Sequence, residues 1–307
     1  MEATLAQVAA TAVINISLAW MAGVLAARLW LTGQTAAWQG PALARLSSAM
    51  SAGLAGCAAG LIVSLWTEAA LMGELPWLHA WPAFFQMLRT THYGHAGAVM
   101  LGLLVVAMAV HWRLRHAGAG ARYAAAITLL LLMVAAARVS TGHAYEHGAL
   151  SVAVWVAWLH LALMSLWAGV VFVAAWLVLP RVLAGPPVPA SELAAYLTSM
   201  SNWAGGALLG ILATGAYNAW RVLGSPRELV QTDYGLVLAF KVCLVVLAIA
   251  LGAFNKFVGL PAALAPTVAP SSQRALHTIV TALRIESVVL SLVIVAAAFL
   301  TGSAPPG

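Results

Sequence analysis

Eight apolar stretches, each long enough to cross a lipid bilayer, limit what this chain can fold into more than any other feature. A transmembrane helix needs roughly 20 predominantly apolar residues. The stretches occupy about residues 5–31, 45–73, 92–112, 122–142, 150–179, 196–222, 234–258 and 275–301. Only 7% of the 307 residues are charged, which is too few to cover a soluble globular surface. The sequence therefore predicts an all-α fold, a polytopic membrane helix bundle with about eight transmembrane helices.

Short segments with glycine or proline separate the stretches, and none is long enough to form a soluble domain. The segment Gly185-Pro186-Pro187-Val188-Pro189 follows the fifth stretch. We expect two regions on either side of it: a five-helix region over residues 1–190 and a three-helix region over residues 191–307. No basic leader precedes the first stretch, so we expect a retained helix rather than a cleaved signal peptide.

Basic residues at the ends of the stretches predict the orientation, because Lys and Arg are retained on the cytoplasmic side. With the amino terminus outside, the cytoplasmic ends hold Arg28, Arg45, Arg113, Arg115, Arg122, Arg181, Lys256 and Arg274, against Arg89, Arg221 and Arg227 outside. Both termini are therefore expected in the periplasm. Most carboxylates fall on the predicted outer side, which suits the attraction of cations. No basic cluster of the kind that follows a nucleic-acid backbone is present, so we expect no nucleic-acid partner.

Most of the histidines fall on the same predicted outer side. His92 and His95 open the third stretch at a spacing of i, i+3, which places them on one helical face. His143 and His147 close the fourth stretch, and His79 lies in the loop before the third. Imidazole is a common ligand of copper and zinc, and affinity favours copper where it is available. The two histidine pairs predict an outer metal site, with Glu68 and Glu146 as accessory acidic residues.

His160 lies about ten residues into the fifth stretch, where an ionisable side chain is a functional candidate by default. Met164 follows one helical turn later on the same face, and its thioether prefers Cu(I). We predict these two residues as a metal site deeper in the membrane. A weaker pattern of sulfur-containing residues extends it through Met100, Met108, Met133, Met50 and Cys57, although core packing is the usual role of such residues.

Other charges inside the stretches require partners. Arg138 and Glu68 are both near predicted outer ends, and we expect them to pair. Lys241, Arg284 and Glu286 lie deeper in the last two stretches, where an ion pair would join two helices or serve transport.

For two further groups of residues we expect no part in metal binding. His111 and His116 fall in or beside a basic loop, where we expect them to be solvated. Trp77, Trp81, Phe84 and Phe85 predict an interfacial segment near the outer site.

Several short motifs in order resemble one known family. They are Asp233-Tyr234-Gly235 followed by Lys241, Leu251-Gly252-Ala253-Phe254-Asn255-Lys256, Arg284-Ile285-Glu286, Thr141-Gly142-His143-Ala144, and His160 to Leu166 followed by Trp167-Ala168-Gly169. In this order and spacing they resemble the copper resistance protein D family (CopD, PcoD). Where members of that family often have Trp-x-Gly-Gly, this chain has Trp167-Ala168-Gly169-Val170, and a family Asn-Arg stands here as Asn255-Lys256.

The resemblance implies a multi-pass protein of the bacterial inner membrane that acts in copper homeostasis. It implies copper, as Cu(I) or Cu(II), moving from periplasm to cytoplasm after delivery by a small periplasmic carrier of the CopC type. We expect a transporter or binding protein rather than an enzyme. No phosphate-binding loop or phosphorylated-aspartate motif is apparent, so ATP-driven pumping is not expected.

Two alternatives use the same residues. Paired histidines on neighbouring helices ligate haem b in membrane electron carriers and metalloreductases, which would make the chain an oxidoreductase. The other alternative is a copper sensor or docking protein that transports nothing.

Overall fold

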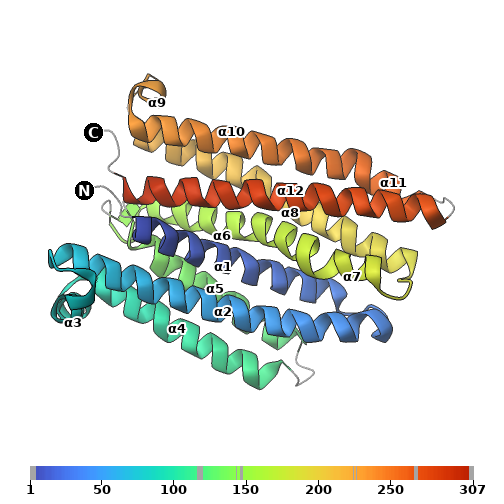
Figure 1. Ribbon diagram of the computed structural model, residues 1–307, viewed down its shortest axis with the longest axis horizontal. Helices are drawn as coiled ribbons and strands as arrows, with labels where there is room; N and C mark the ends of the chain where they lie inside the picture. The colour runs from blue at the N-terminus through green and yellow to red at the C-terminus, as the bar shows by residue number, and fades with distance from the viewer. Residues whose placement is uncertain are drawn as a thin grey trace.

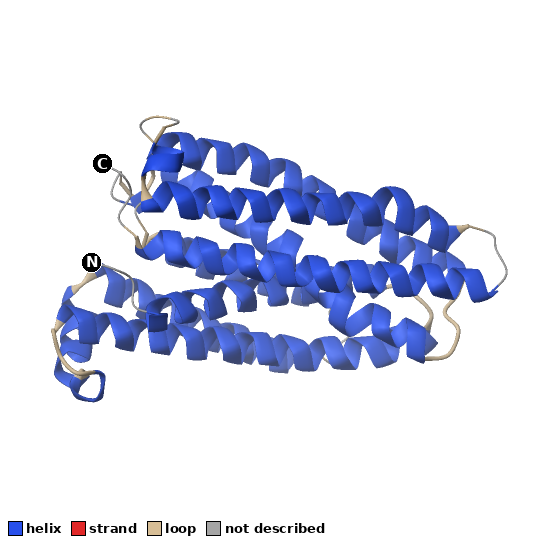
Figure 2. Cartoon of the chain, turned by 45° about the horizontal axis from the view of Figure 1, so that its top comes forward, coloured by secondary structure: helices blue, strands red, loops and turns tan. Residues whose placement is uncertain are grey.

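The computed structural model describes residues 5–115, 120–142, 144–145, 148–223, 225, 227–265 and 269–303. Within these residues the chain is built from helices and connecting segments, and no strand occurs (Figure 2). The expected all-α class is confirmed.

Long helices lie side by side and run along the length of the molecule (Figure 1). They are α1 (Leu5–Leu31), α2 (Ala36–Met72), α4 (His92–Leu114), α5 (Gly120–Val139), α6 (Val152–Val173), α8 (Ala190–Val222), α10 (Asp233–Phe254) and α12 (Ala269–Gly302). The short segments η1 (Trp77–His79), α3 (Trp81–Thr90) and α9 (Glu228–Gln231) precede α4 and α10. The short helices α3 and α9 lie at one end of the bundle, which we call the α3 end (Figure 1). Helix α1 begins and helix α12 ends there as well.

Among the residues that the structure describes, seven helical segments are long and apolar enough to cross a membrane. The predicted sixth span, which corresponds to α8, is not among these seven. Its first half carries the polar residues Ser191, Glu192, Thr198, Ser199, Ser201 and Asn202. At 1.5 Å per residue, however, the 33 residues of α8 extend roughly 50 Å, and the helix runs beside the others (Figure 1). The polytopic bundle is thus confirmed, while the side of the membrane on which the termini lie stays a prediction.

Two long helices end in the same irregular way. A π-helical turn, η3 (Ala174–Val178), follows α6, and another, η4 (Asn255–Gly259), follows α10. Each leads directly into Leu-Pro and a short helix, α7 (Leu179–Ala184) or α11 (Leu260–Leu264). Proline lacks an N–H and its ring clashes with the carbonyl four residues earlier, so a wider turn at that point relieves the conflict. Both short helices lie at the opposite end of the bundle, the α7 end (Figure 1).

The close packing of α1 on α6 depends on two glycines. A Cβ atom on Gly23 would overlap the carbonyl oxygen of Gly169, and one on Gly169 would overlap the carbonyl oxygen of Ala19. Small residues at such crossings let membrane helices approach closely. One glycine in Trp167-Ala168-Gly169-Val170 is therefore sufficient for this contact.

The α3–α4 and α9–α10 connections repeat one local structure. The Gly94 N–H donates to Thr91 Oγ1 over 3.0 Å at the start of α4, and the Gly235 N–H donates to Thr232 Oγ1 over 3.0 Å at the start of α10. A Cβ on either glycine would overlap a carbonyl oxygen seven residues earlier in the preceding short helix. If α7 and α11 are counted with the helices α6 and α10 that they continue, the order long, long, short, long, long occurs in α1–α5 and again in α6–α12. The predicted region boundary near residue 190 falls inside the second of these halves.

His111 corrects one expectation. It was predicted to be solvated, but it lies in α4 and is 0% exposed. Its Nδ1 is 2.9 Å from the hydroxyl of Tyr123, and the guanidinium of Arg28 lies 4.4 Å from the centre of the Tyr123 ring. This cluster joins α1, α4 and α5 and gives His111 a structural role. His116 lies outside the described residues.

Candidate functional site: a histidine cavity between the helices

A cavity of about 570 Å³ lies among α1, α5, α6, α8, α10 and α12. We call it the histidine cavity. Apolar side chains form much of its wall, and its polar or sulfur-containing lining residues include Asn15, Arg138, His160, Met164, Asn218, Arg221, Tyr234 and Lys241. His160 and Met164, the residues predicted as a deep metal site, are thus brought to one cavity. His160 is eight residues beyond the first residue of α6, roughly 12 Å along the helix.

A hydrogen bond from α8 fixes the His160 ring. His160 Nδ1 lies 2.8 Å from Thr214 Oγ1, and Thr214 Oγ1 donates to the carbonyl oxygen of Gly210 over 2.7 Å. A hydroxyl has one proton. When that proton is donated to the Gly210 carbonyl, the Thr214 oxygen accepts from His160 and the ring carries its proton on Nδ1. Nε2 then keeps its lone pair. This is how a second residue prepares a histidine to bind a metal.

Gly215 leaves the space that this ring occupies. A Cβ on Gly215 would lie 3.3 Å from Cε1 of His160. The orientation of the imidazole is therefore set from α8 by both a hydrogen bond and a shape constraint.

The cavity also contains polar atoms that lack partners. Asn15 Oδ1, Arg138 Nε, Asn218 Oδ1 and Arg221 Nε are buried and make no hydrogen bond. Buried polar atoms are nearly always paired, because an unpaired one costs about 1–3 kcal/mol. Four such atoms around one cavity indicate a space built for a polar ligand or for water.

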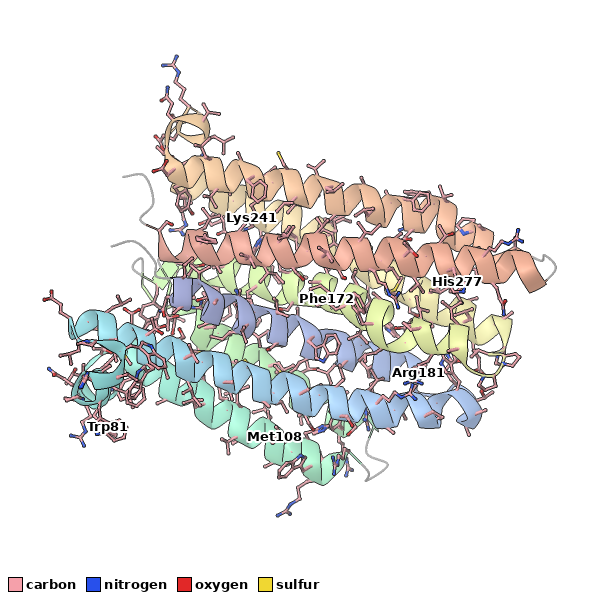
Figure 3. The ribbon with its side chains drawn as sticks, in the orientation of Figure 1. Trp81, Met108, Phe172, Arg181, Lys241 and His277 are labelled. Carbon is pink, nitrogen blue, oxygen red and sulfur yellow. The ribbon has the colours of Figure 1, made fainter. Side chains whose placement is uncertain are left out.

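The charges on the described part of the cavity wall are all positive. Arg138, Arg221 and Lys241 line it, whereas no Asp or Glu does among the described lining residues. Lys241 lies along α10, well inside the bundle (Figure 3). Arg138 donates to Thr141 Oγ1 over 2.8 Å. Such a wall favours a ligand that brings negative charge with it.

The expected ion pairs are not formed within the part of the chain that the structure describes. Glu68 accepts from Gln7 Nε2 over 2.9 Å instead of pairing with Arg138. The guanidinium of Arg284 lies 5.0 Å from the centre of the Trp176 ring, and Glu286 lines a different cavity from Lys241. Each charge has its own surroundings, so these residues do not fasten the last two helices by ion pairing.

The predicted outer histidine site is only partly within the described residues. His92 Nε2 lies 3.0 Å from the carbonyl oxygen of Ser140, and its ring stacks on Tyr145. His95 Nε2 lies 3.2 Å from the carbonyl oxygen of Arg89. His79 is exposed on η1. Their proposed partners His143, His147 and Glu146 lie outside the described residues.

No group of three or more His, Cys, Asp or Glu side chains suited to a metal occurs among the described residues. Of the predicted methionines, only Met164 lines the histidine cavity. Met100 is buried in the core, and Met133 is exposed on the outside of the bundle. Trp81 lies at the α3 end (Figure 3), where Trp77, Trp81, Phe84 and Phe85 make ring contacts with Trp66 or with each other.

Sequence reasoning missed several cavity residues: Asn15, Thr214, Asn218, Arg221 as a lining residue, and Tyr234 as more than a motif residue. A single threonine or asparagine in an apolar stretch is a usable signal, because such a residue needs a partner in the membrane. Which helix supplies the partner depends on packing.

Comparison with known proteins gives one match. The family model CopD, copper resistance protein D, matches residues 194–300, from the first part of α8 to near the end of α12. The resemblance inferred from the motifs is confirmed over this region. No curated protein and no solved structure matches the chain.

Proposed function

We propose that this chain, which belongs to the copper resistance protein D family through residues 194–300, binds copper in the histidine cavity and carries it across the membrane. The family match supports a role in copper resistance, and the apolar helices indicate a multi-pass membrane protein. The observation that carries the finer proposal is the His160–Thr214 hydrogen bond, which leaves Nε2 of His160 able to bind a metal.

His160 and Met164 are the proposed copper ligands. An imidazole nitrogen and a thioether suit Cu(I), and both line the same cavity one helical turn apart. Three basic residues in the wall oppose a bare cation. We therefore expect copper to enter with an anionic ligand, such as a thiolate or a carboxylate.

The remaining steps of the proposal come from the sequence. Copper arrives at the α3 end, taken as the periplasmic side of the inner membrane, from a carrier of the CopC type. His92, His95, His143 and His147 receive it, assisted by Glu68 and Glu146, and it moves toward the cytoplasm.

Copper binding by the purified protein tests the central step. Cu(I) is titrated into the detergent-solubilised full chain against a competing chelator, with wild type and His160→Ala side by side. We expect the variant to lose the highest-affinity site. His277→Ala is the matched control, because His277 is exposed at the α7 end (Figure 3). Unchanged affinity in His160→Ala would refute the assignment of His160.

Transport needs a separate measurement. Copper uptake into proteoliposomes distinguishes a transporter from a sensor or docking protein, because the latter two bind copper without moving it. We expect wild-type uptake to exceed that of empty liposomes and His160→Ala to abolish the difference.

Haem b is a second candidate for the same cavity. The observation in its favour is the combination of apolar walls, a histidine with Nε2 available, and the basic residues Arg138, Arg221 and Lys241, which suit the carboxylates of a haem. A bound haem would supply one-electron redox chemistry, and His160 would hold its iron. Stoichiometric iron and a strong Soret band in the purified protein would establish it, and their absence would dismiss it.

A further inference from the structure

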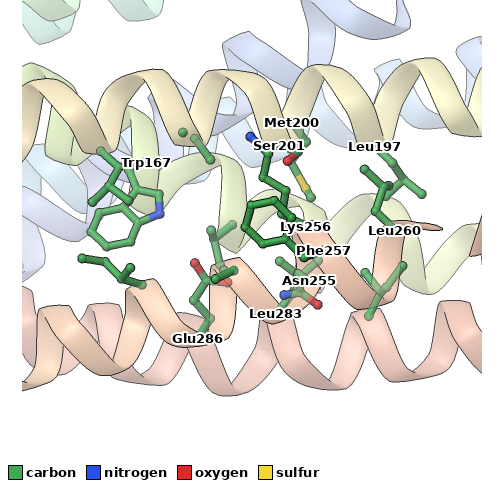
Figure 4. A pocket seen from close by; sticks show the side chains of 18 residues that line it. Trp167, Leu197, Met200, Ser201, Asn255, Lys256, Phe257, Leu260, Leu283 and Glu286 are labelled. Atoms are coloured by element: carbon green, nitrogen blue, oxygen red, sulfur yellow. The ribbon is translucent and has the colours of Figure 1, made fainter. Parts of the chain in front are cut away.

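A second cavity of about 260 Å³ lies among α6, α8, α10, η4, α11 and α12 (Figure 4). We call it the glutamate pocket. Its polar lining residues are Trp167, Ser201, Asn255, Lys256 and Glu286, and Met200 adds a thioether. Ile249 lines both this pocket and the histidine cavity. The two spaces are therefore neighbours, with Ile249 between them.

Glu286 is the central group of the glutamate pocket. It is 2% exposed, and the side chains of Asn255 and Trp167 lie around it (Figure 4). Gly252 leaves room for the carboxylate, because a Cβ there would lie 3.4 Å from Oε1. Among the described residues, no Lys or Arg side chain forms an ion pair with Glu286. A carboxylate charge buried in this way must be balanced by a bound cation.

Asn255 provides an independent indication of a ligand. It is 7% exposed, it lines the pocket beside Glu286, and neither its Oδ1 nor its Nδ2 makes a well-formed hydrogen bond. It is also the first residue of the π-helical turn η4, and such turns occur often at functional sites. The pocket thus contains an amide whose hydrogen bonding is incomplete, beside an acid that has no counter-ion among the described residues.

The other charged groups around Glu286 are few. Lys256 from η4 lines the pocket and is itself exposed, while the lining residues of α6, α8 and α11 include no titratable side chain. From α12, Arg284 faces Trp176 instead of the pocket. The positive charge of Lys256 opposes entry of a metal ion. The donors are mostly hard oxygens, which copper does not prefer to the nitrogen and sulfur of the histidine cavity.

We propose that Glu286 is a proton-binding site, which takes a proton from the Lys256 side of the pocket and releases it again during the transport cycle. The ligand is one proton, held on a carboxylate oxygen with the Asn255 amide as its neighbour. Coupling this proton to copper movement rests on the function proposed above. One proton leaves Glu286 for the aqueous phase as one copper ion passes in the opposite direction.

The proton site is tested without copper. Infrared difference spectra of the purified full chain compare wild type with Glu286→Gln, and we expect the carbonyl band of a protonated carboxylic acid to be lost in the variant. Glu74→Gln, at an exposed position, is the matched control and should keep the band. Dicyclohexylcarbodiimide, which reacts with protonated carboxylic acids in membranes, should form a stable adduct on Glu286 that mass spectrometry detects. Absence of both band and adduct would overturn the proposal.

Coupling is tested in proteoliposomes with an imposed pH gradient. For one-to-one exchange, the equilibrium ratio of copper across the membrane should change about tenfold for each pH unit. Glu286→Gln should keep copper binding and lose this dependence. If the variant keeps the dependence, Glu286 is not the coupling residue. If wild type moves no copper but retains the infrared band, the transport function fails while the proton site stands.

Discussion

Replacing Thr214 by valine tests the feature on which the proposed copper site depends. The two side chains have nearly the same shape, so Thr214→Val removes the hydroxyl that accepts from His160 Nδ1 and leaves the packing of α8 largely unchanged. The hydroxyl also donates to the carbonyl of Gly210, but that carbonyl belongs to the helix backbone and keeps its helical role. The ring of His160 then loses the contact that fixes its orientation and the position of its proton.

The expected size of the effect follows from the role of the bond. Removing the partner that orients a metal-binding histidine typically lowers metal affinity 10- to 100-fold, which corresponds to about 1.4–2.7 kcal/mol. A net hydrogen bond with no such role contributes about 0.5–1.5 kcal/mol to folding. Thr214→Val is therefore expected to weaken the free energy of copper binding by more than it lowers the free energy of unfolding.

The assay is competition for Cu(I) with a chelator of known affinity, together with thermal unfolding in detergent. Thr214→Ser is the matched control, because it keeps the hydroxyl and should bind copper nearly as wild type does. The reasoning fails if Thr214→Val binds copper as tightly as wild type. It also fails if both variants weaken binding equally.

Three further substitutions test the packing around the site. Gly169→Ala should lower the unfolding temperature in detergent, because the added Cβ overlaps the backbone of α1 at a cost of about 1–3 kcal/mol or more. Gly102→Ala is the control: its Cβ meets no atom within 4 Å, so the unfolding temperature should not fall. Gly215→Ala should press on the ring of His160, the proposed copper ligand, and weaken copper binding in the chelator assay. Gly206→Ala, on the same helix with open space around it, should leave binding unchanged. His111→Phe should reduce the free energy of unfolding by about 1–3 kcal/mol, because the buried Tyr123 hydroxyl loses this partner, while copper uptake continues.

The membrane helices were predictable because a bilayer imposes a length and an apolar composition on each crossing. The exception in apolar content, α8, is instructive. Its polar first half includes Ser201, which lines the glutamate pocket, so residues that weaken the hydropathy signal are among those that face a cavity.

The partners of individual side chains were not predictable in the same way. His160 was identifiable as an ionisable residue deep in a span, but Thr214 is 54 residues away, and only the packing of α6 on α8 joins them. His111 was misplaced because its position near the end of a span suggested solvent. Tyr123 from the next helix covers it instead. Ion pairs expected from a similar depth in the membrane did not form among the described residues for the same reason: helix rotation decides which face a charge occupies.

The repeated starts of α4 and α10 bear on the origin of this architecture. The first helices of the two halves, α1 and α6, meet face to face at Gly23 and Gly169, as equivalent helices do across the two-fold interface of a dimer. Parallel repeats in transporters are related by an axis along the membrane normal. The chain thus repeats one order of helices in its two halves. In the first half, Gln7, Ser64, Glu68 and Tyr93 bond to one another, whereas the second half supplies most of the open cavity. The polar interior is therefore closed by hydrogen bonds in one half and left as a cavity in the other.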